Sequence, residues 1–302
     1  MDPLIIVFGF MVGVLVGLTG MGGGALMTPI LILVFGFKPT TAIGTDLAYG
    51  AVTKTVGGWR HFRHGKVNQS LSTWMALGSV PSAILGVYAL HALERASGKS
   101  FDKTVLTCVA AALLFTGAAV LTRALFLPKQ LEREREDFVM ETRHKVSAIV
   151  LGVFVGFVLG VTSAGSGSLI AVGLILLFRL APRQVVATDV FHAAILLWAA
   201  ATAHIVAGNV DFALAGTILI GSVPGVWVGS HWSIATPVSA LRTALGVILI
   251  GSGLGLLAKA GLDIPTPVLA GVPLALLAGL GVQVLVRRTH ALPPPPAAAP
   301  ER

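Results

Sequence analysis

Charged residues are scarce in this chain. Of its 302 residues only 11% are charged and 55% are hydrophobic, and the mean hydropathy is +0.88. A soluble globular domain carries about 25% charged residues. So few charges cannot cover the surface of a water-soluble chain of this size. The composition therefore argues against a soluble enzyme, an isolated nucleic-acid-binding domain and a disordered protein.

Cysteine is scarcer still, because Cys108 is the only one. A single cysteine excludes an intramolecular disulfide and a thiolate metal cluster. The sequence also lacks a His-Glu-x-x-His motif, and its glycine-rich stretches are not followed by the Gly-Lys-Ser/Thr of a nucleotide-binding loop. We therefore expect no metal and no other cofactor. The first residues include no basic region and no small-residue cleavage site, so we expect a retained first helix rather than a signal peptide.

The chain is instead rich in long apolar runs. A membrane-spanning helix needs about 20 mostly apolar residues. Candidate segments lie at 4–20, 23–37, 40–59, 69–93, 103–127, 146–162, 167–180, 184–206, 211–233, 238–258 and 264–286. The sequence therefore predicts an all-α polytopic transmembrane bundle of about eight to eleven helical segments.

Two of these segments, 23–37 and 167–180, are short, and each follows a stretch rich in glycine or serine. Backbone can break inside a membrane only where protein or a water-filled cavity surrounds it. We therefore predict that these two segments are half-helices of broken or re-entrant elements.

The basic residues are sorted to one side of the predicted membrane. Alternating the spans puts 15 Lys and Arg residues on the side of segment 128–145 and 5 on the other, with Lys54 inside a span. Because cytoplasmic loops are rich in Lys and Arg, we expect an inner-membrane protein with its N-terminus outside and its C-terminus cytoplasmic. The net charge of +8 then reflects orientation and contact with anionic lipids, not nucleic acid.

An internal repeat runs through most of the chain. Residues 13–87 align without gaps to residues 156–230, with 23 identities in 75 positions, which indicates a duplication. Each copy has five segments, so the two copies should cross the membrane in opposite directions. The same holds if the first two segments of each copy form a re-entrant hairpin. Inverted repeats are typical of secondary transporters, whose binding sites lie between the repeats near the midplane.

The repeat divides the chain into five parts. We expect a first transmembrane repeat at 1–127, a charged cytoplasmic linker at 128–145 and a second transmembrane repeat at 146–260. An extra C-terminal transmembrane helix follows at 261–288. The Pro/Ala-rich tail at 289–302 is expected to be disordered.

The glycine-rich stretches are the first candidate site. Glycines let backbone N–H groups point at a ligand, and a helix that starts just afterwards adds a positive dipole end. Two such helix starts at the midplane would form an anion cradle, although the same small residues also suit close helix packing. The candidate substrate-binding residues in these stretches are Thr19, Gly22, Gly23, Gly24, Thr162, Ser163, Gly165, Ser166, Gly167 and Ser168.

The second candidate is the repeated pair Thr45-Asp46 and Thr188-Asp189, with His192 close behind. Asp46 and Asp189 are the only carboxylates predicted inside spans, where such residues usually face the bundle interior. They could carry protons, bind a cation or cap a helix start.

Lys54 is the only basic residue predicted inside a span, and it follows Asp46 by eight residues. It could pair with Asp46, hold an anionic substrate, or extend its amine to the membrane surface. The pattern leaves these three alternatives open.

These motifs in combination resemble the TauE/SafE family of sulfite and organosulfonate exporters. The matching runs are 16–24, 44–46, 160–168, 187–189 and 204–211, and the resemblance covers about residues 1–260. It implies an inner-membrane exporter of small sulfur-containing anions, coupled to a proton or cation gradient. The chain departs from the family pattern at two positions. Ala187 stands where many relatives have glycine, and Val172 is the counterpart of Pro29 in the first repeat.

Two other functional classes compete with a transporter. An intramembrane enzyme would need a nucleophile–base pair or a metal motif, and none recurs in the spans. A membrane scaffold or assembly factor would have no need of duplicated, broken, polar segments at the midplane. We therefore predict a transporter that is not an enzyme, with a small anion and membrane lipids as partners and a homodimer left open.

Overall fold

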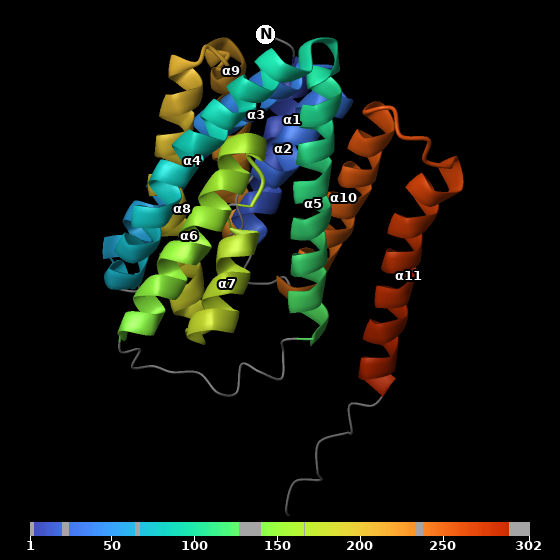
Figure 1. Cartoon of the computed structure of the whole chain (residues 1–302). Coiled ribbons are helices and arrows are strands. Elements are labelled where there is room, and N and C mark those ends of the chain that lie inside the picture. Colours follow the sequence, from blue (N-terminus) through green and yellow to red (C-terminus); the bar gives the residue numbers. More distant parts are fainter. Residues whose placement is uncertain are drawn as a thin grey trace, which may run out of the picture.

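The computed structural model describes residues 3–19, 24–63, 67–126, 140–165, 167–232 and 238–289. These ranges contain eleven α-helices and one short 3₁₀-helix, η1 (Gly98–Ser100). The α-helices are α1 (Pro3–Thr19), α2 (Gly24–Leu33), α3 (Pro39–Arg63), α4 (Gln69–Ser97), α5 (Phe101–Phe126), α6 (Thr142–Thr162), α7 (Ser168–Phe178), α8 (Pro182–Val206), α9 (Phe212–Trp232), α10 (Val238–Lys259) and α11 (Thr266–Thr289). Each predicted segment coincides with one helix, which confirms the all-α bundle (Figure 1).

Within the described ranges, five helices are long and apolar enough to cross a membrane by length and composition. They lie in α4, α5, α6, α8 and α9. Helix α3 is also long, at 25 residues, but it carries the buried polar residues Thr45, Asp46 and Lys54. The fold is therefore a multi-pass membrane bundle in which polar groups of α3 face other helices.

The two predicted half-helices are α2 and α7, which have 10 and 11 residues. At a rise of about 1.5 Å per residue each is roughly 15 Å long, half the thickness of a bilayer core. Helix α7 begins after Gly167, whose φ of 99° suits glycine, and ends at Arg179, which has a φ of 52°. The prediction of short, broken elements at 23–37 and 167–180 is therefore confirmed.

The two repeats are inverted and exchange helices. In Figure 1, α1 begins at the end of the bundle marked N, whereas its counterpart α6 begins at the opposite end, where α5 stops. Helix α1 packs against α9 of the second repeat, and α4 packs against α6. Adding 143 to the residue numbers converts one of these pairs into the other, as a pseudo-two-fold axis requires. The inverted arrangement predicted from the odd number of segments is thus present in the fold.

Glycines allow the exchanged helices to approach closely. A Cβ atom at Gly13 of α1 would collide with the carbonyl oxygen of Ser222 in α9. A Cβ atom at the equivalent Gly156 of α6 would collide with the carbonyl oxygen of Ser79 in α4. Close packing of small residues stabilises helix pairs in membranes. Gly13 and Gly156 therefore serve the packing of the exchanged helices.

Two predicted regions lie mainly outside the described residues. Of the charged linker 128–145, the structure describes 140–145, where α6 begins at Thr142. Of the tail 289–302, it describes Thr289, the last residue of α11. Helix α11 lies at the edge of the bundle and packs on α10 (Figure 1).

Candidate functional site

A cluster of three oxygens joins the two repeats around Asp46. Asp46 Oδ2 lies 2.6 Å from Thr28 Oγ1 and 2.9 Å from Ser163 Oγ, and both hydroxyls can donate to it. The two hydroxyl oxygens are themselves 2.6 Å apart. Asp46 Oδ1 is buried and, among the described residues, has no hydrogen-bond partner. The predicted carboxylate and the predicted Ser163 therefore meet, and the cluster includes a hydroxyl from a third element.

Each member of this cluster is held by a different element. Thr28 lies in the middle of half-helix α2, Asp46 lies in α3, and Ser163 directly follows α6. Ser163 has a φ of 58° and its N–H donates to Leu159 O at 2.8 Å. A left-handed conformation outside glycine is uncommon and costs of order 1–3 kcal/mol. The residue that matches Ser163 in the first repeat is Gly20, so the second repeat accepts strain at this position and gains a hydroxyl.

Thr45 and Thr188 form two matching contacts between the repeats. Thr45 Oγ1 accepts the backbone N–H of Asp211, just before α9, at 3.0 Å. Thr188 Oγ1 accepts the backbone N–H of Asn68, just before α4, also at 3.0 Å. The threonines are the seventh residues of α3 and α8 and therefore lie beyond the first turns of their own helices. The helix starts that they support belong to the other repeat.

Lys54 of α3 and Asp189 of α8 are both buried side chains. The two residues are 6% and 3% exposed, and they are close enough for a charge–charge attraction. Within the described part of the chain, Lys54 Nζ has no hydrogen-bond partner and is buried. The amine therefore lies inside the bundle rather than at the membrane surface, and the carboxylate that attracts it is Asp189 of the other repeat rather than Asp46.

His192 binds α4 and does not join the Asp46 cluster. Its Nε2 lies 3.2 Å from Ser79 Oγ, and its Nδ1 lies 3.5 Å from Ser72 Oγ. The ring is completely buried. These contacts connect α8 of the second repeat to α4 of the first, which is a structural task.

Two of the predicted cradle hydroxyls point back into their own helices. Thr19 Oγ1 donates to Leu15 O at 2.7 Å, and Thr162 Oγ1 donates to Val158 O at 2.6 Å. These contacts again match through the repeat. Both threonines therefore hold the last turns of α1 and α6.

The rest of the predicted cradle lies at the starts of the half-helices. Gly165 and Gly167 have φ values of 112° and 99°, Ser168 is the buried first residue of α7, and Gly24 is the first residue of α2. Gly165 and Gly167 turn the chain from α6 into α7. The remaining candidates Gly22, Gly23 and Ser166 lie outside the described residues.

Comparisons with known proteins identify the family. Residues 5–256 match the family described as "Sulfite exporter TauE/SafE". The chain belongs to the TauE/SafE family. It is 39% identical over 257 residues to "Probable membrane transporter protein YjnA" of Bacillus subtilis (strain 168), an alignment that covers 85% of this chain and 100% of that relative.

Other relatives carry similar names. "Probable membrane transporter protein YdhB" of the same bacterium is 28% identical over 84% of this chain and 99% of its own length. "Probable membrane transporter protein MJ0441" of Methanocaldococcus jannaschii is 27% identical over 56% of this chain and 59% of its own length. No solved structure matches the chain. This TauE/SafE protein is therefore a membrane transporter rather than an enzyme.

Sequence reasoning missed one member of the transporter's polar cluster, Thr28. It is the only polar side chain of α2, whose sequence is otherwise apolar or glycine. A lone hydroxyl in a short apolar half-helix was the signal that could have identified it. Its counterpart in the second repeat is Ala171, so the repeat alignment does not point to it.

No metal site emerges from the described ranges of this transporter, since no three His, Cys, Asp or Glu side chains gather there. What the Asp46 cluster offers is two hydroxyl groups and one carboxyl group. Groups of this kind can exchange protons and donate hydrogen bonds to an anion.

Proposed function

We propose that this transporter exports small sulfur-containing anions, such as sulfite or an organosulfonate, across the cell's inner membrane in exchange for protons that move inward. The single observation that carries the proposal is the cluster of Asp46, Thr28 and Ser163 between the repeats. The description of the matching family as sulfite exporters supports the substrate class.

The anion binds where the half-helices begin. Gly24 and Ser168 start α2 and α7, and the free N–H groups and positive dipole of a helix start attract negative charge. Ser163 lies five residues before Ser168 and adds a hydroxyl donor. A sulfonate group presents three oxygens, which several converging donors can bind together.

The proton binds at Asp46, and the reason is a count of hydrogens. The cluster has three oxygen–oxygen contacts of 2.6, 2.6 and 2.9 Å, all within hydrogen-bonding range. If Asp46 is ionised, Thr28 and Ser163 both donate to it, and no hydrogen lies between their own two oxygens. A proton on Oδ2 supplies the third hydrogen, so that each contact in the ring holds one.

Proton and anion therefore alternate at this place. In the closed ring both hydroxyl hydrogens are in use, and in the ionised state both point at Asp46. An anion therefore gains these donors only when the proton leaves, the ring opens and the hydroxyls turn from Asp46 to the anion. Such exchange couples outward anion movement to inward proton movement. The positive ends of α2 and α7 offset the charge that Asp46 then regains.

Each of the two bodies that move combines helices from both repeats. Because glycine contacts join α1 to α9 and α4 to α6, the first repeat cannot rock as one body against the second without breaking both interfaces. We therefore assign alternating access to movement of the α1–α9 pair relative to the α4–α6 pair. The excess of Lys and Arg places the linker and the C-terminus in the cytoplasm and the N-terminus outside.

Purified protein in proteoliposomes tests the proposal. Counterflow of labelled sulfite, thiosulfate, sulfate and an organosulfonate is measured with and without a pH gradient. We expect at least one sulfur-containing anion to exchange above protein-free vesicles, and a pH gradient to drive its net movement. No exchange of any of these anions would refute the substrate class. Exchange that does not respond to the pH gradient would refute the coupling of anion transport to proton movement.

A further inference from the structure

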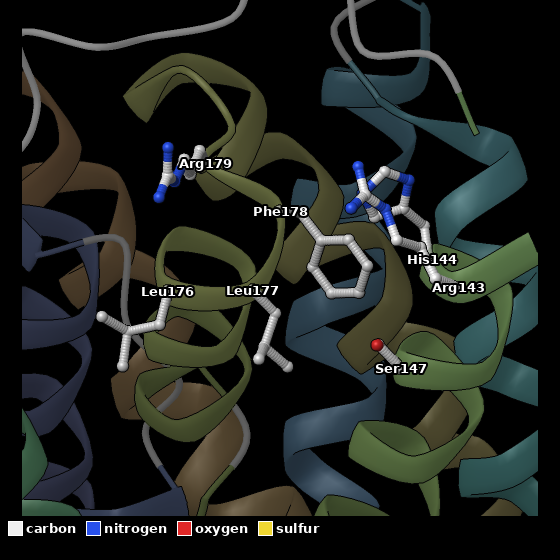
Figure 2. A pocket seen from close by; sticks show the side chains of 7 residues that line it. All are labelled: Arg143, His144, Ser147, Leu176, Leu177, Phe178 and Arg179. Carbon is white, nitrogen blue, oxygen red and sulfur yellow. The ribbon is translucent and has the colours of Figure 1, made fainter. Parts of the chain in front are cut away.

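A polar pocket lies away from the Asp46 cluster, at the end of the bundle where α6 begins and α7 stops. Its volume is about 340 Å³, and Arg143, His144, Ser147, Phe178 and Arg179 line it. Figure 2 shows side chains of α6 and α7 around this space, with the guanidinium groups of Arg143 and Arg179 on opposite sides of it. The whole length of α7 separates it from Ser168, so it does not belong to the proposed transport site.

Arg179 occupies a backbone position that favours glycine. Among the described non-glycine residues, only Ser163 and Arg179 have a positive φ, which is 52° for Arg179. Its counterpart in the first repeat is Gly36, with a φ of 71°. The same turn thus follows both half-helices, and the second repeat places an arginine where the first has the unstrained residue. Ser163, the other strained residue, contacts Asp46, so strain at these positions accompanies a useful side chain.

A merely structural role for Arg179 does not account for this strain. A basic residue near a helix C-terminus is stabilising because it opposes the negative end of the helix dipole. A lysine or arginine inside the last turn of α7 would do so with ordinary helical backbone. That turn instead contains Leu176, Leu177 and Phe178. Placing the guanidinium after the helix directs it to the pocket, at the cost of a left-handed backbone.

The charges around the pocket leave a net cationic site. Arg143 Nε binds Glu141 Oε2 at 2.7 Å, and the guanidinium has further N–H donors. No carboxylate of the described residues pairs with Arg179. His144 Nδ1 accepts the Glu141 backbone N–H at 3.2 Å, which fixes the ring at the start of α6. Two guanidinium groups, of which one has no acidic partner, suit a ligand with several anionic oxygens.

The rim of the pocket is apolar. Leu176 and Leu177 are 53% and 50% exposed, although they line the same space as the arginines. Lys145 follows His144 in α6, and its Nζ lies 5.2 Å from the centre of the Trp74 ring of α4. Aromatic and basic residues of this kind gather at the level of lipid headgroups. The pocket therefore combines cationic groups and apolar surface at the expected membrane boundary.

We propose that this pocket binds an oxyanion of the phosphate or sulfonate type, presented either by the headgroup of an anionic phospholipid or by a free ion. The site is independent of the proposed transport function, because it is defined by binding at Arg179 and Arg143.

The decisive variant is Arg179→Gly, which installs the residue of the first repeat. It removes the guanidinium and relieves the strained backbone, so the thermal midpoint should stay the same or rise. Native mass spectrometry measures phosphatidylglycerol retained by the intact protein, with phosphatidylcholine as the neutral comparison. Equilibrium dialysis with labelled sulfate measures the free ion. We expect R179G to lower the affinity for one of these two anionic probes by about tenfold.

Two further variants keep the result interpretable. Arg95→Gln removes a charge near the end of α4 and should change neither binding measurement. Arg143→Gln removes the second guanidinium from a different helix and should weaken the same probe as R179G. Selective loss of phosphatidylglycerol identifies the lipid as the source, and selective loss of sulfate identifies the free ion. If R179G and R143Q bind both probes as the unmodified protein does, the site does not exist.

Discussion

The two repeats of this transporter share a backbone but differ in their chemistry. Identical threonines, Thr45 and Thr188, receive equivalent N–H groups from the opposite repeat. By contrast, Thr28 and Lys54 of the first repeat correspond to Ala171 and Leu197 of the second. The repeated threonines hold the interlocked frame, and the residues that differ, Thr28 and Lys54, add polar groups to the interior.

The two aspartates make this contrast sharpest. Asp46 and Asp189 occupy the same position in the two repeats, yet Asp46 contacts two hydroxyls whereas Asp189 is within range of attraction by the amine of Lys54. A cation near a buried carboxylate favours its ionised form, whereas burial with no cation nearby favours the protonated form. In the proposed mechanism, duplication thus produced one position for a fixed charge and one position for an exchanging proton.

The largest expected effect is on the charge pair. Replacing Lys54 by leucine, the residue of the second repeat, removes the cation that Asp189 faces and should destabilise the protein by about 3 kcal/mol. The loss is measured as a lower thermal midpoint in detergent. The double variant K54L/D189N should recover most of the stability. Equal stability of K54L and the unmodified protein would show that the pair contributes nothing.

Asp46→Asn tests the other carboxyl group. An amide keeps the size of the side chain but cannot release a proton, so transport driven by a pH gradient should fall by about 100-fold, equivalent to about 2.7 kcal/mol. Counterflow without a gradient should be affected much less. Asp189→Asn is the matched control and should retain the response to pH. If D189N loses that response and D46N keeps it, the two roles are reversed.

The shared frame can be broken at its glycines. Gly156→Ala places a Cβ atom against the Ser79 carbonyl and should destabilise the protein by about 2 kcal/mol through overpacking. Gly216→Ala is the control, because a Cβ atom there meets nothing within 4 Å and alanine favours a helix. Thermal unfolding should therefore separate the two variants clearly. Similar midpoints would mean that the exchanged helices separate easily.

The smallest expected effect concerns Ser163. Ser163→Gly restores the residue of the first repeat, so stability should hold or rise by about 1 kcal/mol. Loss of one hydrogen bond to Asp46 should nevertheless weaken pH-driven transport by about tenfold, equivalent to about 1.4 kcal/mol.

Ser163→Ala is the companion variant. It removes the same hydroxyl but keeps a side chain in the left-handed conformation, so it should lose transport equally and be less stable than S163G. Unchanged transport in both variants would remove Ser163 from the mechanism.

Local composition was sufficient to predict the helices, the half-helices and the inverted repeat. Their signals are the length of an apolar run, a glycine-rich break and a duplication with an odd number of segments, and all three can be read along the chain. The same reasoning selected Asp46, Asp189 and Lys54, because charge inside an apolar run is expensive and therefore rare.

The partners of those residues were decided only by the tertiary structure. Thr28 meets Asp46, and Lys54 faces Asp189 instead of Asp46, because α2, α3, α6 and α8 pack across the pseudo-two-fold axis. Arg179 was likewise visible as a base but not as a strained residue beside a pocket. Sequence by itself determined which groups must be buried, since the cost of burial depends on the residue and its segment. Which group each one meets depends on contacts between distant segments, and those exist only once the helices have packed.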